Sequence, residues 1–142
     1  MEKDVLITVK GMQKAGEESD NQSITCQGVY HMKNMKHYIS YEEDLEDGKK
    51  KTVIKLIDDE NAPCVDVITT GAVETHMVFE KNRKKLSPYN TPYGTFLLEF
   101  LTKDIAVFVS EESIIASIKY SISMEGKLLS ENAMDIKVES KA

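Results

Sequence analysis

The chain lacks several features on which common functions depend. Of its 142 residues only two are cysteine and three are proline, and tryptophan is absent. No stretch approaches the roughly 18 consecutive apolar residues of a transmembrane helix. The 18 basic residues are outnumbered by 24 acidic ones, so the net charge is −6 and no broad basic surface is available for phosphate backbones or anionic lipid. We therefore expect one soluble globular domain over residues 1–142, with neither nucleic acid nor membrane as a partner.

Motifs for catalysis and for metal binding are also missing. Cys26 and Cys64 have neither a CxxC nor a zinc-ligand spacing, so both are interpreted as structural residues. His31, His37 and His76 are too dispersed to form a metal motif, and His76 is expected to face solvent. The chain has no Gly-x-Ser-x-Gly nucleophile motif and no glycine-rich phosphate loop. The sequence predicts no cofactor, no metal site and no enzyme activity.

The amino-terminal residues carry no sign of an export signal. The segment Met1-Glu2-Lys3-Asp4 leads directly into Val5-Leu6-Ile7, without the basic start, longer apolar stretch and cleavage site of a signal peptide. We expect a cytoplasmic protein, in which a disulfide between the two cysteines would not form.

Apolar residues recur at every second position from one end of the chain to the other, which is typical of half-buried β-strands. The stretch from Ile114 to Met124 would also fit one side of a helix, but its serine and β-branched residues favour a strand. Residues 13–21 are polar and contain Gly16, so they are interpreted as a long hairpin loop. Asp47-Gly48 predicts a tight turn. In residues 37–43 two alternations compete, and the inner side stays open.

About ten strands separated by short turns favour an antiparallel meander. An open sheet of this length would leave two adhesive edges, whereas closing the sheet removes them. A two-layer sandwich usually needs longer crossover connections than this chain shows. The predicted fold is all-β: a closed antiparallel up-and-down barrel, calycin-like or lipocalin-like, of about 8–10 strands.

Two connections are candidates for a role at the ends of the barrel. The basic turn formed by Lys81, Arg83, Lys84 and Lys85 is interpreted as a solvated hairpin tip, with phosphate or an acidic partner as the alternative. Residues 87–94 are interpreted as a longer connection that contains Thr91, Pro92, Tyr93 and Gly94. The two prolines predict a stiff loop folded over one barrel end, as a structural lid first and a ligand gate second. Gly71 is expected to allow a bulge or a bend.

Several local patterns resemble one protein family. They lie at residues 38–43, 70–71, 77–79, 91–95, 102–105, 118–122 and 132–136, and the Thr91-Pro92-Tyr93-Gly94 motif is the most specific of them. In order and spacing they resemble the YwiB family, small bacterial proteins of unknown function with a calycin-like barrel. The resemblance covers nearly the whole chain and implies the fold, but it implies neither an activity nor catalytic residues.

The predicted barrel suggests a function through its interior. A barrel of about eight strands is just filled by side chains or holds one small ligand, and more strands widen the interior. With aromatic residues at only 7%, medium-sized side chains would leave a cavity for a small apolar ligand. The residues expected to line it are Tyr30, Met77, Phe79, Phe96, Phe100 and Tyr120. The alternative is a packed barrel without ligand that acts as an interaction or structural module, including as a homodimer.

Overall fold

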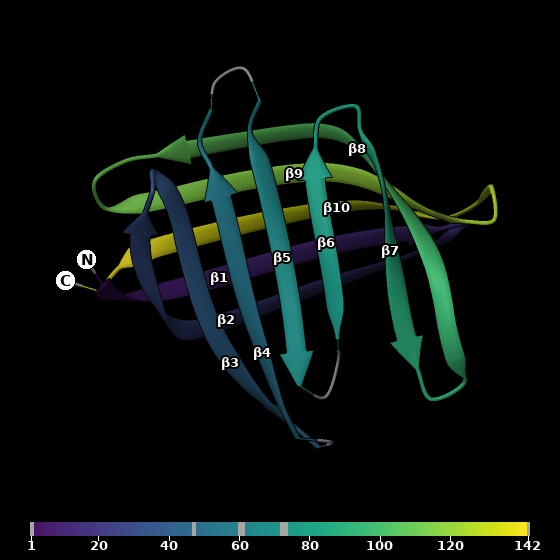
Figure 1. Ribbon diagram of the computed structural model, residues 1–142, viewed down its shortest axis with the longest axis horizontal. Helices are drawn as coiled ribbons and strands as arrows, with labels where there is room; N and C mark the ends of the chain where they lie inside the picture. The colour runs from purple at the N-terminus through teal and green to yellow at the C-terminus, as the bar shows by residue number, and fades with distance from the viewer. Residues whose placement is uncertain (1, 47, 60–61, 72–73, 142) are drawn as a thin grey trace.

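The computed structural model describes residues 2–46, 48–59, 62–71 and 74–141. These residues form ten β-strands in one antiparallel sheet, which curls into a barrel (Figure 1). The strands are β1 (Glu2–Ala15), β2 (Glu18–Lys33), β3 (Lys36–Leu45), β4 (Gly48–Ile57), β5 (Cys64–Gly71), β6 (Thr75–Glu80), β7 (Lys84–Thr91), β8 (Gly94–Val109), β9 (Ser113–Met124) and β10 (Lys127–Ser140). The all-β, up-and-down fold is confirmed, as is the strand assignment of residues 114–124. Among the described residues, no helix is long and apolar enough to cross a bilayer.

The first and last strands close most of the cylinder. The strand order is β6-β5-β4-β3-β2-β1-β10-β9-β8-β7, so β1 pairs with β10 in the middle of the sheet and the chain ends lie close together (Figure 1). Each neighbouring pair is antiparallel, as expected when short hairpins join consecutive strands. The sheet order therefore places its two edges at β6 and β7.

The barrel is nearly closed rather than fully closed. Within the described residues, no backbone ladder joins β6 to β7. The Ser87 hydroxyl of β7 instead donates a hydrogen bond of 2.6 Å to the backbone carbonyl of His76 on β6. Pro88 also lies in β7, where the missing amide is tolerated because the strand is at an edge. The predicted complete closure thus stops at this seam.

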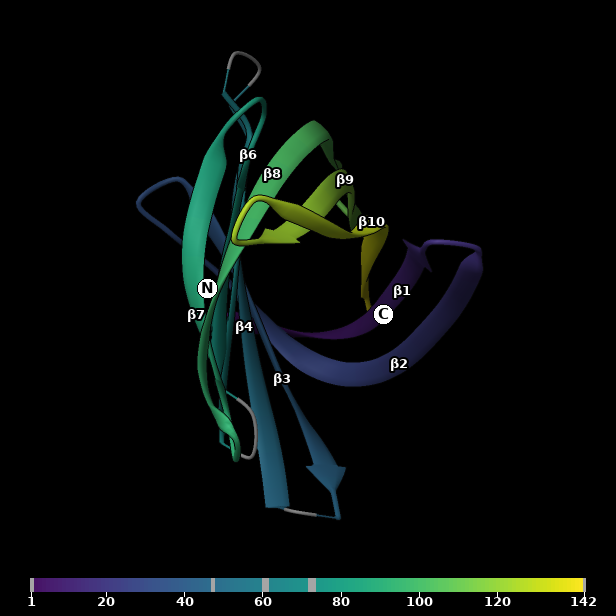
Figure 2. The same ribbon diagram turned by 90° about the vertical axis from the view of Figure 1, so that its right-hand side faces the viewer.

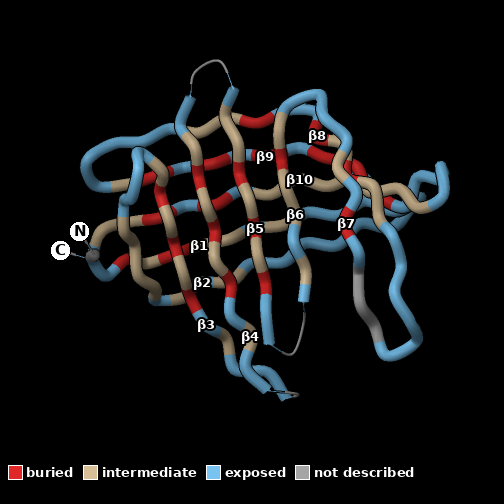
Figure 3. Tube along the Cα trace, viewed as in Figure 1, coloured by how far each residue is buried: buried red, intermediate tan, exposed pale blue. Residues whose placement is uncertain are grey.

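Alternate residues of each strand point into the core. On β3 the buried residues are His37, Ile39 and Tyr41, which settles the inner side of residues 37–43. The ring of Phe79 is fully buried and packs against Phe100 and Tyr120, with centroid separations of 6.4 and 4.7 Å. Red buried positions in Figure 3 run across the middle of the barrel, and exposed ones gather at the hairpins.

The predicted loop at residues 13–21 is wrong. Strands β1 and β2 continue their ladder through the pairs Gln13↔Asp20 and Ala15↔Glu18, so the turn is confined to Gly16 and Glu17. Gly16 has a φ of 64°, which glycine adopts without steric cost. This end of the hairpin is exposed, and its strands therefore lack the alternation of apolar and polar residues by which a half-buried strand is recognised.

The other predicted connections have mixed outcomes. The longer connection expected at residues 87–94 is wrong, because β7 extends to Thr91 and the turn is short. Gly71 ends β5 with a φ of 101°, and a Cβ there would collide with the Lys49 carbonyl oxygen. Gly48 has a positive φ of 126°, while Asp47 lies outside the described residues.

Close strand approach requires one glycine inside the sheet. Gly28 on β2 pairs with Val5 of β1 and with Tyr41 of β3, where it is the last pair of the β2–β3 ladder. The whole of β2 is strongly curved (Figure 2). A Cβ at this position would collide with Ile7 Cδ1 and with the backbone carbonyl oxygen of Ser40. The close approach of the neighbouring strands at Gly28 therefore excludes any larger residue unless those neighbours move.

Candidate functional site

The meander gathers five hairpins at one end of the barrel. Since consecutive strands run in opposite directions, the β1–β2, β3–β4, β5–β6, β7–β8 and β9–β10 connections share that end, and both termini lie at the other. We call the first end the hairpin end. Its geometry depends on which side chains the ten strands point inward there.

On one side of the hairpin end, the inner surfaces of the strands change from apolar to polar. On β4 the inward residues run from Leu56 and Ile54 in the core to Thr52 and then Lys50. On β5 the same change leads from Val67 to Thr69. Corresponding polar positions on the other strands of this side are Gln13, Gln22, Glu43, Thr75 and Asn132. We call this side the polar wall.

On the other side the inner surfaces stay apolar up to the hairpins. Strand β8 contributes Phe100, Leu98 and Phe96, and β9 contributes Ile122 and Met124. These strands therefore give the hairpin end an apolar wall opposite the polar one.

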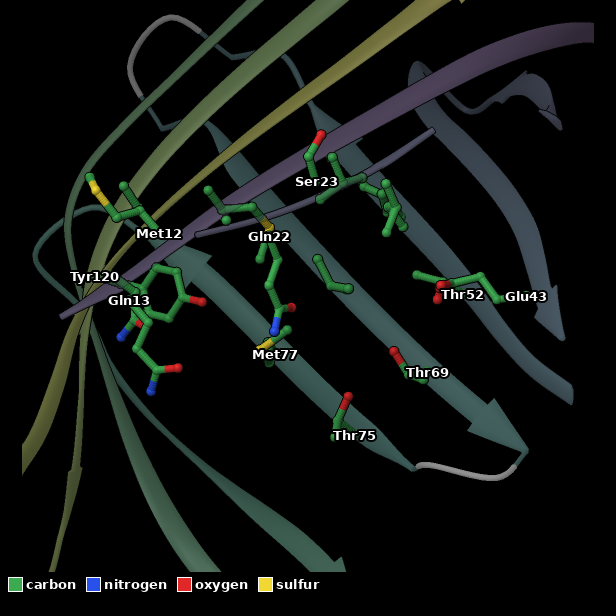
Figure 4. A pocket seen from close by; sticks show the side chains of 18 of the residues that line it. Met12, Gln13, Gln22, Ser23, Glu43, Thr52, Thr69, Thr75, Met77 and Tyr120 are labelled. Atoms are coloured by element: carbon green, nitrogen blue, oxygen red, sulfur yellow. The ribbon is translucent and has the colours of Figure 1, made fainter. Parts of the chain in front are cut away.

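A cavity of about 390 Å³ lies against the polar wall. Figure 4 shows three of its hydroxyl groups, from Thr52, Thr69 and Thr75, on the three successive strands β4, β5 and β6. The phenol of Tyr120 enters the same cavity from β9. We call this space the inner compartment.

A second cavity of about 490 Å³ lies against the apolar wall. We call it the outer compartment. Gln13, Thr75 and Met77 line both compartments, so the two cavities adjoin at these residues. Each volume lies within the range of roughly 300–1,000 Å³ that small-molecule sites usually have.

Acidic groups dominate the charge of the inner compartment. Its charged lining residues within the described part of the chain are Asp20, Glu43 and Lys50, two carboxylates against one ammonium. Lys50 Nζ lies 3.8 Å from Glu43 Oε1, and the two residues face each other in the β3–β4 ladder. Both side chains are partly buried, with exposed fractions of 31% and 20%. Lys50 is thus already engaged by a carboxylate.

The two phenols that line the compartment, Tyr41 and Tyr120, resist ionisation. Burial, opposed by a hydrogen bond from Thr52 and reinforced by the charge of Glu43, raises the pKa of Tyr41 to about 12. Burial likewise raises the pKa of Tyr120 to about 12. Both phenols remain protonated near neutral pH, where they can donate and accept hydrogen bonds. The environment favours neutral and cationic groups over additional anions.

The predicted lumen residues do not all meet. Met77 and Tyr120 line the inner compartment, and Met77, Phe96 and Phe100 line the outer one. Phe79 is fully buried in the aromatic cluster, so it is a core residue beneath the compartments. Tyr30 lies at the opposite end of the barrel.

At that opposite end, Tyr30 contacts a buried histidine. Its hydroxyl lies 2.7 Å from His37 Nδ1, next to a cavity of about 150 Å³. Burial lowers the pKa of His37, and the negative charge of Asp58 partly opposes this shift. The Tyr30 hydroxyl can donate a hydrogen bond to Nδ1 of the neutral imidazole, so the pair is satisfied without a ligand.

The two other candidate features lie on the surface. In the basic turn, Lys81 lies 4.0 Å from Asp104, while Arg83 and Lys85 lie 3.8 and 3.5 Å from Glu80. The turn is solvated as expected, but it is not the tip of a hairpin, because β6 and β7 do not pair within the described residues. The loop at residues 91–94 is the tip of the β7–β8 hairpin, and Tyr93 there is 94% exposed. The predicted lid is therefore wrong: a two-residue turn continues the hairpin outward instead of folding back.

Sequence reasoning missed the polar half of the site. Glu43, Lys50 and Thr69 follow their apolar neighbours at intervals of two, so they occupy inward positions of the same strands. A polar residue at an inward position was the available signal, but the pattern alone does not distinguish it from the end of a strand. His76 is exposed as expected, 4.0 Å from Asp66. Within the described residues, no group of three or more His, Cys, Asp and Glu side chains is placed to hold a metal ion.

Together these observations define a class: a ten-stranded, nearly closed antiparallel β-barrel with a two-walled cavity at one end. The chain belongs to the family described as "Domain of unknown function (DUF1934)", whose model matches residues 7–136. It is 31% identical over 109 residues to the uncharacterised β-barrel protein YwiB of Bacillus subtilis (strain 168), covering 75% of this chain and 74% of the relative.

A solved structure supports the same family. The crystal structure of the ywiB protein from Bacillus subtilis superimposes with a TM-score of 0.85, at 26% sequence identity, and covers 99% of this chain and 94% of that one. The predicted resemblance to the YwiB family is confirmed. The relative's name gives a fold and no activity.

Proposed function

We propose that this barrel binds a small molecule in the cavity at its hairpin end. The observation that carries the proposal is the outer compartment, a space of about 490 Å³ bounded by Leu98, Phe100, Ile122 and other apolar side chains. When a ligand removes the apolar side chains around such a space from water, binding becomes more favourable by about 25 cal/mol per Å² of apolar surface buried. A packed barrel used only for interactions would not need this space.

The proposed role is binding without catalysis. The described lining residues of the two compartments include neither histidine nor cysteine. The two phenols are poor bases and nucleophiles because their high pKa keeps them protonated. A cytoplasmic location and a homodimer stay predictions from the sequence.

A matched pair of tryptophan variants tests the proposal. Leu98 lines the outer compartment, whereas the adjacent Leu97 does not line it and is 55% exposed. The probe is the neutral dye N-phenyl-1-naphthylamine, whose fluorescence rises in apolar surroundings. We expect the wild type and Leu97→Trp to bind it, and Leu98→Trp to bind it about tenfold more weakly because the larger ring takes up part of the compartment.

Circular dichroism and urea unfolding of each variant provide the folding control. Wild-type protein that gives no saturable fluorescence increase would overturn the proposal. So would equal dye affinity in the two variants, since the dye would then lie outside this cavity.

A further inference from the structure

We infer that the ligand is an amphipathic molecule with a protonated amine, which binds with the amine in the inner compartment beside Glu43 and its apolar chain in the outer compartment. This inference rests on the proposed function and adds the chemical class and orientation of the ligand.

The division of the cavity between two unlike walls sets the amphipathic character. The outer compartment is lined mainly by apolar side chains from β7, β8 and β9, whereas hydroxyl, amide and charged groups concentrate on the strands around the inner one. A wholly apolar ligand in the inner compartment would take the Thr69 hydroxyl and the Glu43–Lys50 pair out of water without offering them a hydrogen bond, which costs free energy for each buried polar group. A wholly polar ligand would leave the apolar wall uncovered. One molecule with a polar head and an apolar chain satisfies both.

Continuity between the compartments lets one molecule occupy both. Thr75 and Met77 on β6, together with Gln13 on β1, line the two cavities in common. The flexible, unbranched Met77 side chain at this boundary adapts easily to an apolar chain that passes it. No separate second ligand is needed.

Charge sets the nature of the polar head. An anionic head would meet Asp20 and Glu43, and Lys50, the one cation among the described lining residues, is already paired with Glu43 at 3.8 Å. An ammonium group meets the opposite situation: it carries three N–H donors, and Glu43 offers a second carboxylate oxygen besides the one facing Lys50. The hydroxyl oxygens of Thr52 and Thr69 supply further acceptors on the same wall. Figure 4 shows Glu43 and Thr52 close to one another at one end of this group.

Three ligands with the same apolar chain separate the head group from the chain. Decylamine, 1-decanol and decanoate are each used to displace N-phenyl-1-naphthylamine from the wild type, below their critical micelle concentrations. We expect decylamine to bind about tenfold more tightly than 1-decanol, because a charge-assisted hydrogen bond is about twice as strong as a neutral one, and decanoate to bind most weakly.

Two substitutions on β3 assign the effect to the inward carboxylate. Glu43→Gln removes it, and Glu42→Gln removes the same charge from an exposed neighbour that pairs with Lys51 on the outer face. We expect Glu43→Gln to abolish the preference for the amine over the alcohol and Glu42→Gln to retain it. Lys50→Gln is the second inward variant, and it should tighten amine binding because it releases the carboxylate from its present partner.

The outcomes distinguish the two proposals. Absence of dye binding by the wild type contradicts the proposed function itself. Dye binding with equal displacement by amine, alcohol and carboxylate contradicts only the amine head. The amine head is also contradicted if Glu42→Gln removes the preference for the amine as fully as Glu43→Gln does. The overall negative charge of the protein would then be responsible.

Discussion

Replacing Phe79 by alanine should destabilise the barrel strongly, because this ring on the seam strand β6 packs against rings of β8 and β9. It is 0% exposed and contacts two other rings, Phe100 edge-on and Tyr120 at a tilt of 53°. Truncation of a buried phenylalanine typically costs about 3–5 kcal/mol, of which each aromatic pair accounts for about 0.5–1.5 kcal/mol. Since a domain of this kind is stable by about 5–15 kcal/mol, the loss is a large share of the total.

The assay is urea unfolding followed by far-ultraviolet circular dichroism, with the change in unfolding free energy taken from the midpoints. Phe108→Ala is the matched control, because Phe108 is 69% exposed and its loss should change stability by no more than about 0.5 kcal/mol. Equal midpoints for the two variants would refute the assignment of Phe79 to the core. Unchanged stability of Phe79→Ala together with lost dye binding would assign Phe79 to the ligand cavity instead.

Two further predictions concern the close strand approach at Gly28 and the far end of the barrel. Gly28→Ala should lower the unfolding free energy by about 1–3 kcal/mol, because the new Cβ collides with Ile7 and with the Ser40 carbonyl; urea unfolding that matches the wild type would contradict the close approach. Burial lowers the pKa of His37 below its usual 6.5, so the stability due to its neutral form is present above pH 6.5 and lost as the pH falls through the folded-state pKa. Wild-type protein should therefore unfold at a lower urea concentration at about pH 5 than at about pH 7.5, and His37→Gln should reduce this difference. A difference of unchanged size in His37→Gln would show that other groups cause it.

The alternation of apolar residues was sufficient to predict the architecture. Strand β9 illustrates why: Ile114, Ala116, Ile118 and Tyr120 alternate without interruption, and a half-buried strand is the structure that buries all of them. Where a ladder extends beyond the core, as at Gln13↔Asp20, no apolar residue is needed and the signal disappears. The seam between β6 and β7 had no comparable signal, since it depends on how the two edges meet in space.

The candidate site was predictable only in part. The alternation of residues along a strand shows which face of the sheet a side chain lies on, but not how far along the barrel it lies. Tyr30 and Met77 were both assigned to the inner surface, yet Met77 lies at the hairpin end and Tyr30 lies at the other end beside His37. The same limit applies to Phe79, whose inward direction was predicted but whose place in the packed centre was not. Depth follows from register, which ladder pairing sets across all ten strands.

The most direct test of the two-walled cavity is the orientation of one bound molecule. Intermolecular nuclear Overhauser effects between decylamine and the protein, with methyl groups assigned, report which residues lie near each end of the ligand. We predict contacts from the methylene next to the amine to the methyl groups of Thr52 and Thr69, and from the terminal methyl to Leu98 and Ile122. Contacts in the reverse order, or confined to exposed residues such as Leu97 and Phe108, would contradict the account.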